Sequence, residues 1–205
     1  MSNPWLEIPV SDYENHMKEV GQAKILNSLI KSCLDKYQPK NFALLGCTTG
    51  NGLEHINPEI TNKIYAIDIN PEYLQKTKER FVAKIQNLEI LNIDIQNDEL
   101  TIKNVDLFFV GLVLEYIETE KALIKIIRTL SKKGILIIII QKNKKTSFVS
   151  KTKYKSLKKL EKISNEVNEQ LINKFIQSEN MELIERDEIK LTENKSFIKL
   201  KYRMK

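Results

Sequence analysis

The sequence predicts an α/β fold with a doubly wound, mostly parallel, seven-stranded sheet and an N-terminal helical cap. Three observations predict it. Short apolar runs alternate with longer amphipathic stretches between residues 41 and 140, which is typical of strands joined by crossover helices. Glycine or aspartate follows each of the first four apolar runs, as expected where the strands of a parallel sheet end near a ligand. Two runs near the C-terminus, separated by Thr-Glu-Asn-Lys, predict an antiparallel hairpin.

The first part of the chain predicts a lead-in and a long helix. Residues 1–10 contain two prolines and are expected to be extended. Ser11 and Glu14 have the spacing of a capping box, so a helix should begin there. Apolar residues then recur every three to five positions until Pro39 ends the pattern. The expected helix covers 11–37.

The other elements follow from the same signals. Pro71 predicts the start of a helix, because proline is favoured in a first helical turn. Gly134 precedes the most apolar run, which is typical of a buried strand. The expected strands are 41–46, 63–69, 88–93, 105–110, 135–140, 182–191 and 196–204. The expected later helices are 51–57, 71–86, 119–130 and 154–179.

The 205 residues are expected to form a single domain, with a helical cap over 1–40 and a Rossmann-like core over 41–205. The start of the chain has no basic segment followed by a long apolar run, and the run 135–140 is too short to span a bilayer. Cys33 and Cys47 lie far apart and predict neither a disulfide framework nor a metal site. These features indicate a cytoplasmic protein without a membrane partner.

The chain has a formal net charge of +6, with 41% apolar and 29% charged residues. This composition is ordinary for a globular protein. The most lysine-rich stretch is 141–159, QKNKKTSFVSKTKYKSLKK, in which Phe148 and Tyr154 are the only aromatic residues. It is interpreted as a solvated surface or lid. Nucleic-acid binding through this stretch is an alternative that is not favoured.

The stretch 43–52, ALLGCTTGNG, joins the end of a strand to three glycines. Glycine permits positive φ and lets backbone amides approach a ligand closely. The dinucleotide-binding pattern G-x-G-x-x-G would need a glycine three residues after Gly52, where His55 stands. The loop therefore either holds a ligand of another nucleotide-like class or serves only as a turn.

Four motifs in order resemble those of the class I S-adenosylmethionine-dependent methyltransferases: LLGCTTGNG, IYAIDIN, LEILNIDI and VDLFFVGLVLEYI. The resemblance covers about 40–205 and includes the closing hairpin. It implies S-adenosylmethionine as cofactor and methyl transfer as the reaction. The loop residues that it assigns to the cofactor are Gly46, Cys47, Thr48 and Gly50.

The resemblance also assigns roles at the ends of the next strands. Asp68 would hold the ribose hydroxyls, because a carboxylate accepts strong hydrogen bonds from both. Ile69 would pack on the adenine, Asp94 would accept from the adenine amino group, and Ile95 would contribute its backbone. Gly111 would lie near the methionine end. Capping of local turns is the alternative role for both aspartates.

One position departs from the family pattern. Many members carry an acid two residues before the first glycine, near the amino group of the ligand, and Leu44 stands there in this chain. A non-catalytic protein that binds S-adenosylmethionine or a nucleotide is therefore an alternative.

The short-chain dehydrogenases are a further alternative, with NADP as cofactor. Their glycine turn has a related spacing, and Tyr154 and Lys158 have the spacing of their Tyr-x-x-x-Lys pair. Their Asn-Ala-Gly after the fourth strand is absent, and the glycine turn lies behind a helix rather than at the start of the chain. An oxidoreductase is therefore less favoured than a methyltransferase.

Methyl transfer needs a positioned acceptor and exclusion of water, with no metal and no covalent residue. A base is optional. The acceptor is predicted to be a small molecule, and an RNA- or protein-directed enzyme is the alternative. Tyr13 is expected to contact the cofactor near its methionine end, and His55 to pack or be solvated. The expected catalytic residues are His16, Glu115 and Tyr116, with Trp5 and Met17 as further pocket candidates.

Overall fold

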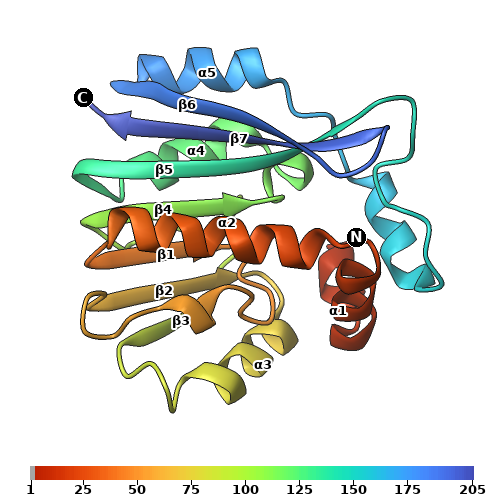
Figure 1. The fold of residues 1–205 in the computed structure, drawn as a ribbon, viewed down its shortest axis with the longest axis horizontal. Helices are drawn as coiled ribbons and strands as arrows, with labels where there is room; N and C mark the ends of the chain where they lie inside the picture. The colour runs from red at the N-terminus through yellow and green to blue at the C-terminus, as the bar shows by residue number, and fades with distance from the viewer. Residues whose placement is uncertain (1–2) are drawn as a thin grey trace.

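A seven-stranded sheet lies between two layers of helices in the computed structural model, which describes residues 3–205 (Figure 1). The strand order is β3-β2-β1-β4-β5-β7-β6. Strands β1 to β5 pair in parallel, and β7 pairs antiparallel with both β5 and β6, so the predicted fold class is confirmed. The strands are β1 (Asn41–Leu45), β2 (Lys63–Asp68), β3 (Leu88–Asn92), β4 (Val105–Gly111), β5 (Leu130–Asn143), β6 (Met181–Lys190) and β7 (Lys195–Met204).

The strand order reverses between β1 and β4. From β1 the chain adds β2 and β3 on one side, and then crosses to add β4 and β5 on the other. Leu45, near the end of β1, is paired with Ile67 of β2 and with Val110 of β4. In parallel sheets, such a switch leaves a crevice outside the carboxyl ends of the two strands, where ligands bind.

Both faces of the sheet are covered, and the middle positions of the central strands are apolar. In β1, Ala43 and Leu45 face one hydrophobic cluster, whereas Phe42 and Leu44 face the other. Side chains alternate between the faces of a strand, so a continuous apolar run feeds two cores. On the first face lie α4 (Thr119–Ile127) and α5 (Glu169–Ser178). On the second lie α2 (Gln22–Tyr37) and α3 (Pro71–Phe81).

The N-terminal cap (residues 3–21) consists of the 3-10 helix η1 (Pro4–Glu7) and the helix α1 (Val10–Glu19). The expected continuous helix 11–37 is wrong, because Gly21 has a φ of 74° and separates α1 from α2. The expected extended lead-in is also partly helical, in η1. The capping box does not form, since Pro9 occupies the N-cap position. The carboxylate of Glu14 instead accepts hydrogen bonds from Thr49 and Arg80.

The segment after β5 differs most from the prediction. A continuous helix over 154–179 is wrong: the 3-10 helix η4 (Lys155–Lys162) is separated from α5 by non-helical residues. The side chain of Asn168 accepts from two backbone amides and caps the N-terminus of α5, which is the start signal that the prediction overlooked. We call residues 144–164 the strap. It crosses the carboxyl ends of the central strands beside the N-terminal cap (Figure 1).

Smaller differences concern the ends of elements. The expected helix 51–57 is a single 3-10 turn, η2 (Leu53–His55), and the expected helices 71–86 and 119–130 end earlier, at Phe81 and Ile127. The strand expected at 135–140 extends further at both ends as β5. Among residues 3–205, none of the helices combines the length and apolar character that crossing a membrane requires.

Candidate functional site

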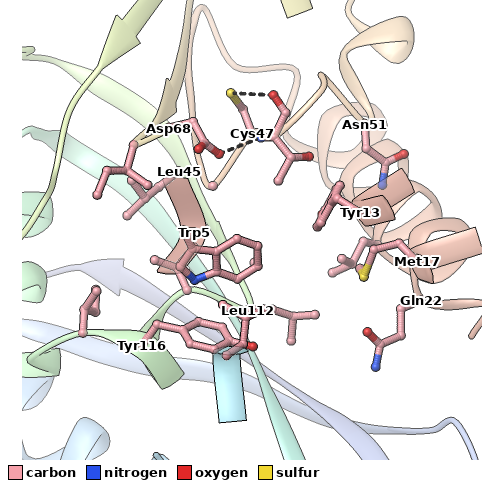
Figure 2. A pocket seen from close by; sticks show the side chains of 18 of the residues that line it. Trp5, Tyr13, Met17, Gln22, Leu45, Cys47, Asn51, Asp68, Leu112 and Tyr116 are labelled. Atoms are coloured by element: carbon pink, nitrogen blue, oxygen red, sulfur yellow. Dashed lines mark hydrogen bonds between the residues drawn. The ribbon is translucent and has the colours of Figure 1, made fainter. Parts of the chain in front are cut away.

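A pocket lies at the carboxyl ends of β1, β2 and β4, beneath the N-terminal cap and the strap (Figure 2). It brings together most of the residues that the sequence predicted. Those that line it are Trp5, Tyr13, His16, Met17, Leu44, Gly46, Cys47, Thr48, Asp68, Ile69, Asp94, Ile95, Gly111 and Tyr116. Gly50, His55 and Glu115 do not line it.

The glycine loop forms one wall of the pocket. The backbone amides of Gly46 and Cys47 both donate to the carbonyl of Ile67, at 2.9 and 3.1 Å, which ties the loop to β2. Gly46 has a φ of +72°, and a Cβ placed on it would lie 2.5 Å from Cγ2 of Val113. Only glycine meets both conditions without strain. The loop therefore packs closely against the side chain of Val113, in the segment after β4.

Asp68 ends β2 and faces the loop. Its two carboxylate oxygens accept hydrogen bonds from the backbone amides of Thr48 and Asn70, both at 2.9 Å. Each oxygen therefore keeps acceptor capacity for a ligand. Burial raises the pKa of Asp68 to about 6, although these two amides oppose the shift. Asp68 therefore caps the local turns, as its alternative role predicts, and its oxygens can still accept hydrogen bonds from a ligand.

The loop after β3 forms the far end of the pocket. The carboxylate of Asp94 accepts from the backbone amide of Gln96 at 3.0 Å and from the side-chain amide of Asn97 at 2.8 Å. Ile95 is buried beside it. The Nζ of Lys125, on α4, donates to the carbonyls of Ile95 and Gln96 and fixes the loop against the helix layer.

The N-terminal cap is fastened to the glycine loop by an ion pair. Oε1 of Glu14 accepts from Oγ1 of Thr49 at 2.6 Å and from the guanidinium of Arg80 at 2.5 Å. These hydrogen bonds lower the pKa of Glu14. Arg80 also donates to the carbonyl of Thr49. Glu14 lies on α1, Thr49 in the glycine loop and Arg80 on α3, so these hydrogen bonds join the three segments.

Aromatic rings gather at the end of the pocket nearest β4 and the strap. The ring of Trp5 packs edge-on against Tyr116, with centroids 5.1 Å apart, and against Tyr13 at 6.2 Å. Tyr116 also packs edge-on against Phe148 of the strap, at 5.8 Å. Figure 2 shows the rings of Trp5 and Tyr116 side by side across the cavity from Asp68. The side-chain amide of Asn70 donates to the carbonyl of Trp5, which anchors η1 over the pocket.

His16 connects the cap to the strap. Its Nδ1 lies 2.9 Å from Oγ1 of Thr152. The ring is 4% exposed, and burial lowers the pKa of His16 below its usual value, so the imidazole is neutral at pH 7. Two further bonds join the same segments, from Oγ of Ser156 to Asp12 at 2.5 Å and from Nζ of Lys159 to Glu7 at 2.6 Å. The cap and the strap therefore cover the pocket as one unit.

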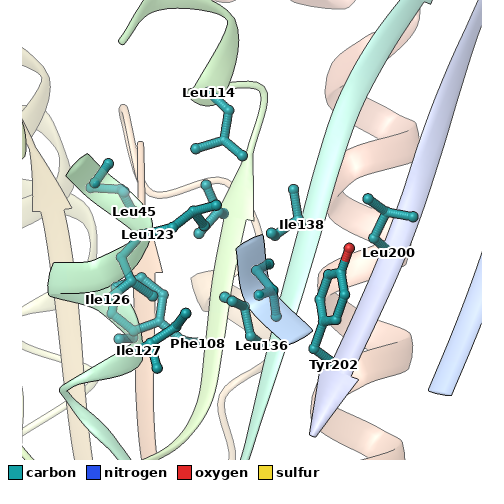
Figure 3. Packing of buried hydrophobic residues seen from close by; sticks show 14 of the residues in the cluster. Leu45, Phe108, Leu114, Leu123, Ile126, Ile127, Leu136, Ile138, Leu200 and Tyr202 are labelled. Carbon is teal, nitrogen blue, oxygen red and sulfur yellow. The ribbon is translucent and has the colours of Figure 1, made fainter. Parts of the chain in front are cut away.

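The residues after β4 point in different directions, because they form a 3-10 turn, η3 (Leu114–Tyr116). Leu114 points into the core behind the sheet (Figure 3), and Tyr116 lines the pocket. Glu115 is fully buried between them. Its Oε1 accepts from the backbone amide of Gln141 at 2.6 Å, and its Oε2 has no partner among the described residues. Burial raises the pKa of Glu115 to about 7.

The Glu115 carboxyl should make folding stability depend on pH. Its folded-state pKa lies above the ordinary 4.5, so the stability it provides is complete below about pH 4.5 and is lost as the pH rises through 7. A Glu115→Gln variant cannot ionise there. Urea unfolding should show that the stability of the variant relative to the wild type rises by roughly 3 kcal/mol between pH 4.5 and pH 8. A difference that does not change with pH would contradict this assignment.

Two glutamines that the sequence does not mark as site residues also line the pocket. Nε2 of Gln22, at the start of α2, donates to Oε1 of Gln141, near the end of β5, at 2.7 Å. Nε2 of Gln141 also donates to the carbonyl of Phe148, at 2.8 Å. Both glutamines line the pocket and connect α2, β5 and the strap. No local pattern could reveal a contact between residues 119 positions apart.

The Tyr-x-x-x-Lys pair does not lie at the site. Tyr154 packs in the small hydrophobic cluster of the strap, with Nζ of Lys153 5.4 Å from its ring centre. Lys158 is exposed, and neither residue lines the pocket. This arrangement gives the oxidoreductase alternative no support.

Comparisons with known sequences agree with this geometry. A family model described as a methyltransferase domain matches residues 44–138. A carboxy-S-adenosyl-L-methionine synthase of Ruthia magnifica subsp. Calyptogena magnifica is 30% identical over 126 residues, or 58% of this chain and 51% of that protein. The chain thus spans about half the length of the curated relative it matches.

Solved structures share the fold at low sequence identity. The plantazolicin methyltransferase BpumL, in complex with S-adenosylhomocysteine, has a TM-score of 0.71 at 13% identity, covering 95% of this chain and 90% of that one. The N-methyltransferase NodS of Bradyrhizobium japonicum WM9 has a TM-score of 0.62 at 17% identity, covering 91% and 94%. At these identities, the likeness establishes the fold alone.

Proposed function

We propose that the chain is a class I S-adenosylmethionine-dependent methyltransferase, which the matched methyltransferase-domain model supports, and that it transfers the methyl group of S-adenosylmethionine to an acceptor held at the strap end of the pocket. One observation carries the proposal. The glycine loop, Asp68, Asp94 and Gly111 come from four places in the chain, and they line one pocket where the strand order reverses.

The residues present fit this cofactor. The ribose hydroxyls would donate to Asp68, whose oxygens have capacity beyond the two backbone amides they accept. The adenine would lie between Ile69 and Ile95, with its amino group toward Asp94. The methionine part would run along the glycine loop toward Gly111. Leu44 is buried in the wall of the pocket, so the amino group of the ligand would be held by neighbouring backbone rather than by an acid.

When bound, S-adenosylmethionine supplies an electrophilic methyl group: a bond forms from the acceptor atom to the methyl carbon, the carbon–sulfur bond breaks, and S-adenosylhomocysteine is released. The chain has to hold the acceptor in line and exclude water. The cap and the strap would do both, because they are joined to each other over the pocket.

His16 is the proposed proton acceptor. In the tautomer whose Nδ1–H donates to Oγ1 of Thr152, Nε2 keeps a lone pair for the proton that leaves the acceptor. The lowered pKa keeps this nitrogen unprotonated at neutral pH. Tyr116 would orient the acceptor by packing. Glu115 would act through Gln141 as a positioning residue, since it does not line the pocket.

We propose a small-molecule acceptor, because the pocket is covered by the cap and the strap. The test incubates the protein and an Asp68→Ala variant with methyl-labelled S-adenosylmethionine and a cell extract. The extract is then divided into a low-mass filtrate, RNA and protein. Label in the filtrate that depends on Asp68 supports the proposal. Label in RNA or protein would move the acceptor to that class, and no label with intact cofactor binding would favour a non-catalytic binding protein.

Cofactor binding should depend on pH through Asp68. The pKa of this group in the free protein is about 6, and the ribose hydroxyls favour the ionised carboxylate. Affinity for S-adenosylhomocysteine should therefore be constant above about pH 7 and fall by up to tenfold per unit below pH 6. Trp5 is the single tryptophan and lines the pocket, so its emission provides the titration signal. Unchanged affinity from pH 8 to pH 5 would contradict a bond to the Asp68 carboxylate.

A further inference from the structure

We propose that the methyl acceptor is an electrically neutral, flat aromatic molecule. The inference rests on the proposed methyl transfer and names the substrate class of the same site. It is carried by the distribution of charge around the pocket and by the side chains at its strap end.

The sheet order separates the two ends of the pocket. Asp68 and Asp94 follow β2 and β3, on one side of the switch point. Tyr116 follows β4 and Gln141 lies near the end of β5, on the other side. A cofactor whose ribose is held by Asp68 and whose methionine part lies along the glycine loop would direct its methyl group toward Tyr116 and the strap. The acceptor would therefore meet the side chains of this second end.

The positive charge of the strap lies outside this end. The nearby buried Lys195, whose Nζ donates to the carbonyl of Phe148 and to Oγ of Ser150, does not line the pocket. The strap contains eight lysines and one glutamate, a formal charge of +7, whereas the whole chain carries +6. The rest of the chain thus carries −1. All eight strap lysines are exposed, and its apolar residues Val149, Leu157 and Leu160 are buried beneath them. The strap turns its charge to solvent and its apolar side to the pocket.

The interior of the pocket offers no cation to an acidic acceptor. The chain has 33 lysine and arginine residues, yet none of the described residues that line the pocket is one. The charged residues of the lining are Asp68 and Asp94, at the cofactor end. An anion brought under the strap would lose its hydration without gaining a partner, which costs several kcal/mol. The interior therefore disfavours an anionic acceptor.

A cationic acceptor is disfavoured for other reasons. A protonated amine has no lone pair with which to attack a methyl group. The strap, at +7, also repels cations from the cover of the pocket. A neutral acceptor avoids both penalties.

The side chains at the strap end define the rest of the class. The ring of Tyr116 packs edge-on against both Trp5 and Phe148, so a flat molecule can present its face or edge to these rings. The polar groups there are uncharged: the neutral imidazole of His16 and the amides of Gln22 and Gln141. They suit a hydroxyl or an N–H on an aromatic ring, which each can meet with one hydrogen bond.

The test uses three probes of one shape and different charge: 2-naphthol, which is neutral at pH 7, 2-naphthoate, an anion, and 2-naphthylmethylammonium, a cation. Each is titrated by calorimetry into the protein saturated with S-adenosylhomocysteine, and again without it. We expect 2-naphthol to bind at least tenfold more tightly than either ion. The net charge alone would favour 2-naphthoate. Equal or tighter binding of either ion, or no binding of any probe, would overturn the inference.

Two variants locate the binding. Tyr116→Leu should weaken 2-naphthol binding at least fivefold and leave S-adenosylhomocysteine binding within twofold of wild type. Tyr154→Leu is the matched control, because Tyr154 belongs to the strap cluster without lining the pocket. Equal weakening in both variants would overturn the placement. Failure of S-adenosylhomocysteine to bind would instead reject the proposed function, and the titrations without it would still measure the charge preference.

Discussion

Replacing Asp68 by alanine is expected to weaken binding of S-adenosylhomocysteine at least 100-fold. Each hydrogen bond from a ribose hydroxyl to a carboxylate contributes roughly 1.5–3 kcal/mol, and two would be lost. The backbone amides of Thr48 and Asn70 would also lose their acceptors, so the glycine loop would hold its shape less well. Calorimetric titration of both proteins measures the effect.

The matched control for this change is Asp35→Ala. Asp35 is exposed on α2 and forms an ion pair with Lys31, one turn away. Such a surface pair contributes little, so this variant should bind like the wild type. An Asp68→Ala protein that is folded and binds within threefold of wild type would exclude Asp68 from the cofactor site.

Replacing Gly46 by alanine is expected to lower the free energy of unfolding by roughly 2–4 kcal/mol. Part of this arises from a positive φ, which costs about 1 kcal/mol or more for alanine. The rest arises because the new Cβ would lie 2.5 Å from Cγ2 of Val113, and overpacking costs about 1–3 kcal/mol. Affinity for S-adenosylhomocysteine should fall as well, because Gly46 and Val113 both line the pocket.

Gly21→Ala separates the two contributions. Gly21 has nearly the same φ, +74° against +72° for Gly46, but a Cβ on it would meet no atom within 4 Å. It should therefore cost only the backbone part, about 1 kcal/mol. Urea unfolding of the two variants gives the comparison. If both variants lost the same free energy of unfolding, the glycine loop would not be in tight contact with the segment after β4.

The fold could be predicted because the central parallel strands are apolar runs separated by longer amphipathic stretches. Residues such as Phe42 and Ala43 serve opposite cores, and this makes the runs continuous and easy to detect. The helical segments were less predictable. Apolar residues recur every three to four positions from Leu157 to Leu171, and only the cap at Asn168 shows that a new helix begins there. The break at Gly21 requires a backbone angle that the apolar period of the surrounding helix does not reveal.

The cofactor end of the site could be predicted because its residues follow strands, whose carboxyl ends meet at one edge of a parallel sheet. The acceptor end could not. In the turn η3, neighbouring side chains point in different directions, so the sequence could not tell the buried Glu115 from the pocket-lining Tyr116. The pair of Gln22 and Gln141 depends on how the strap folds over the sheet, which is a long-range property.

The most direct test of the central claim is calorimetric titration of the wild-type protein with S-adenosylmethionine, S-adenosylhomocysteine and NADPH. The pocket at the switch point predicts one site per chain that binds the first two with micromolar dissociation constants and does not bind NADPH. Preferential binding of NADPH, or binding of none of the three by the folded protein, would contradict the assignment of this pocket to a methyl donor.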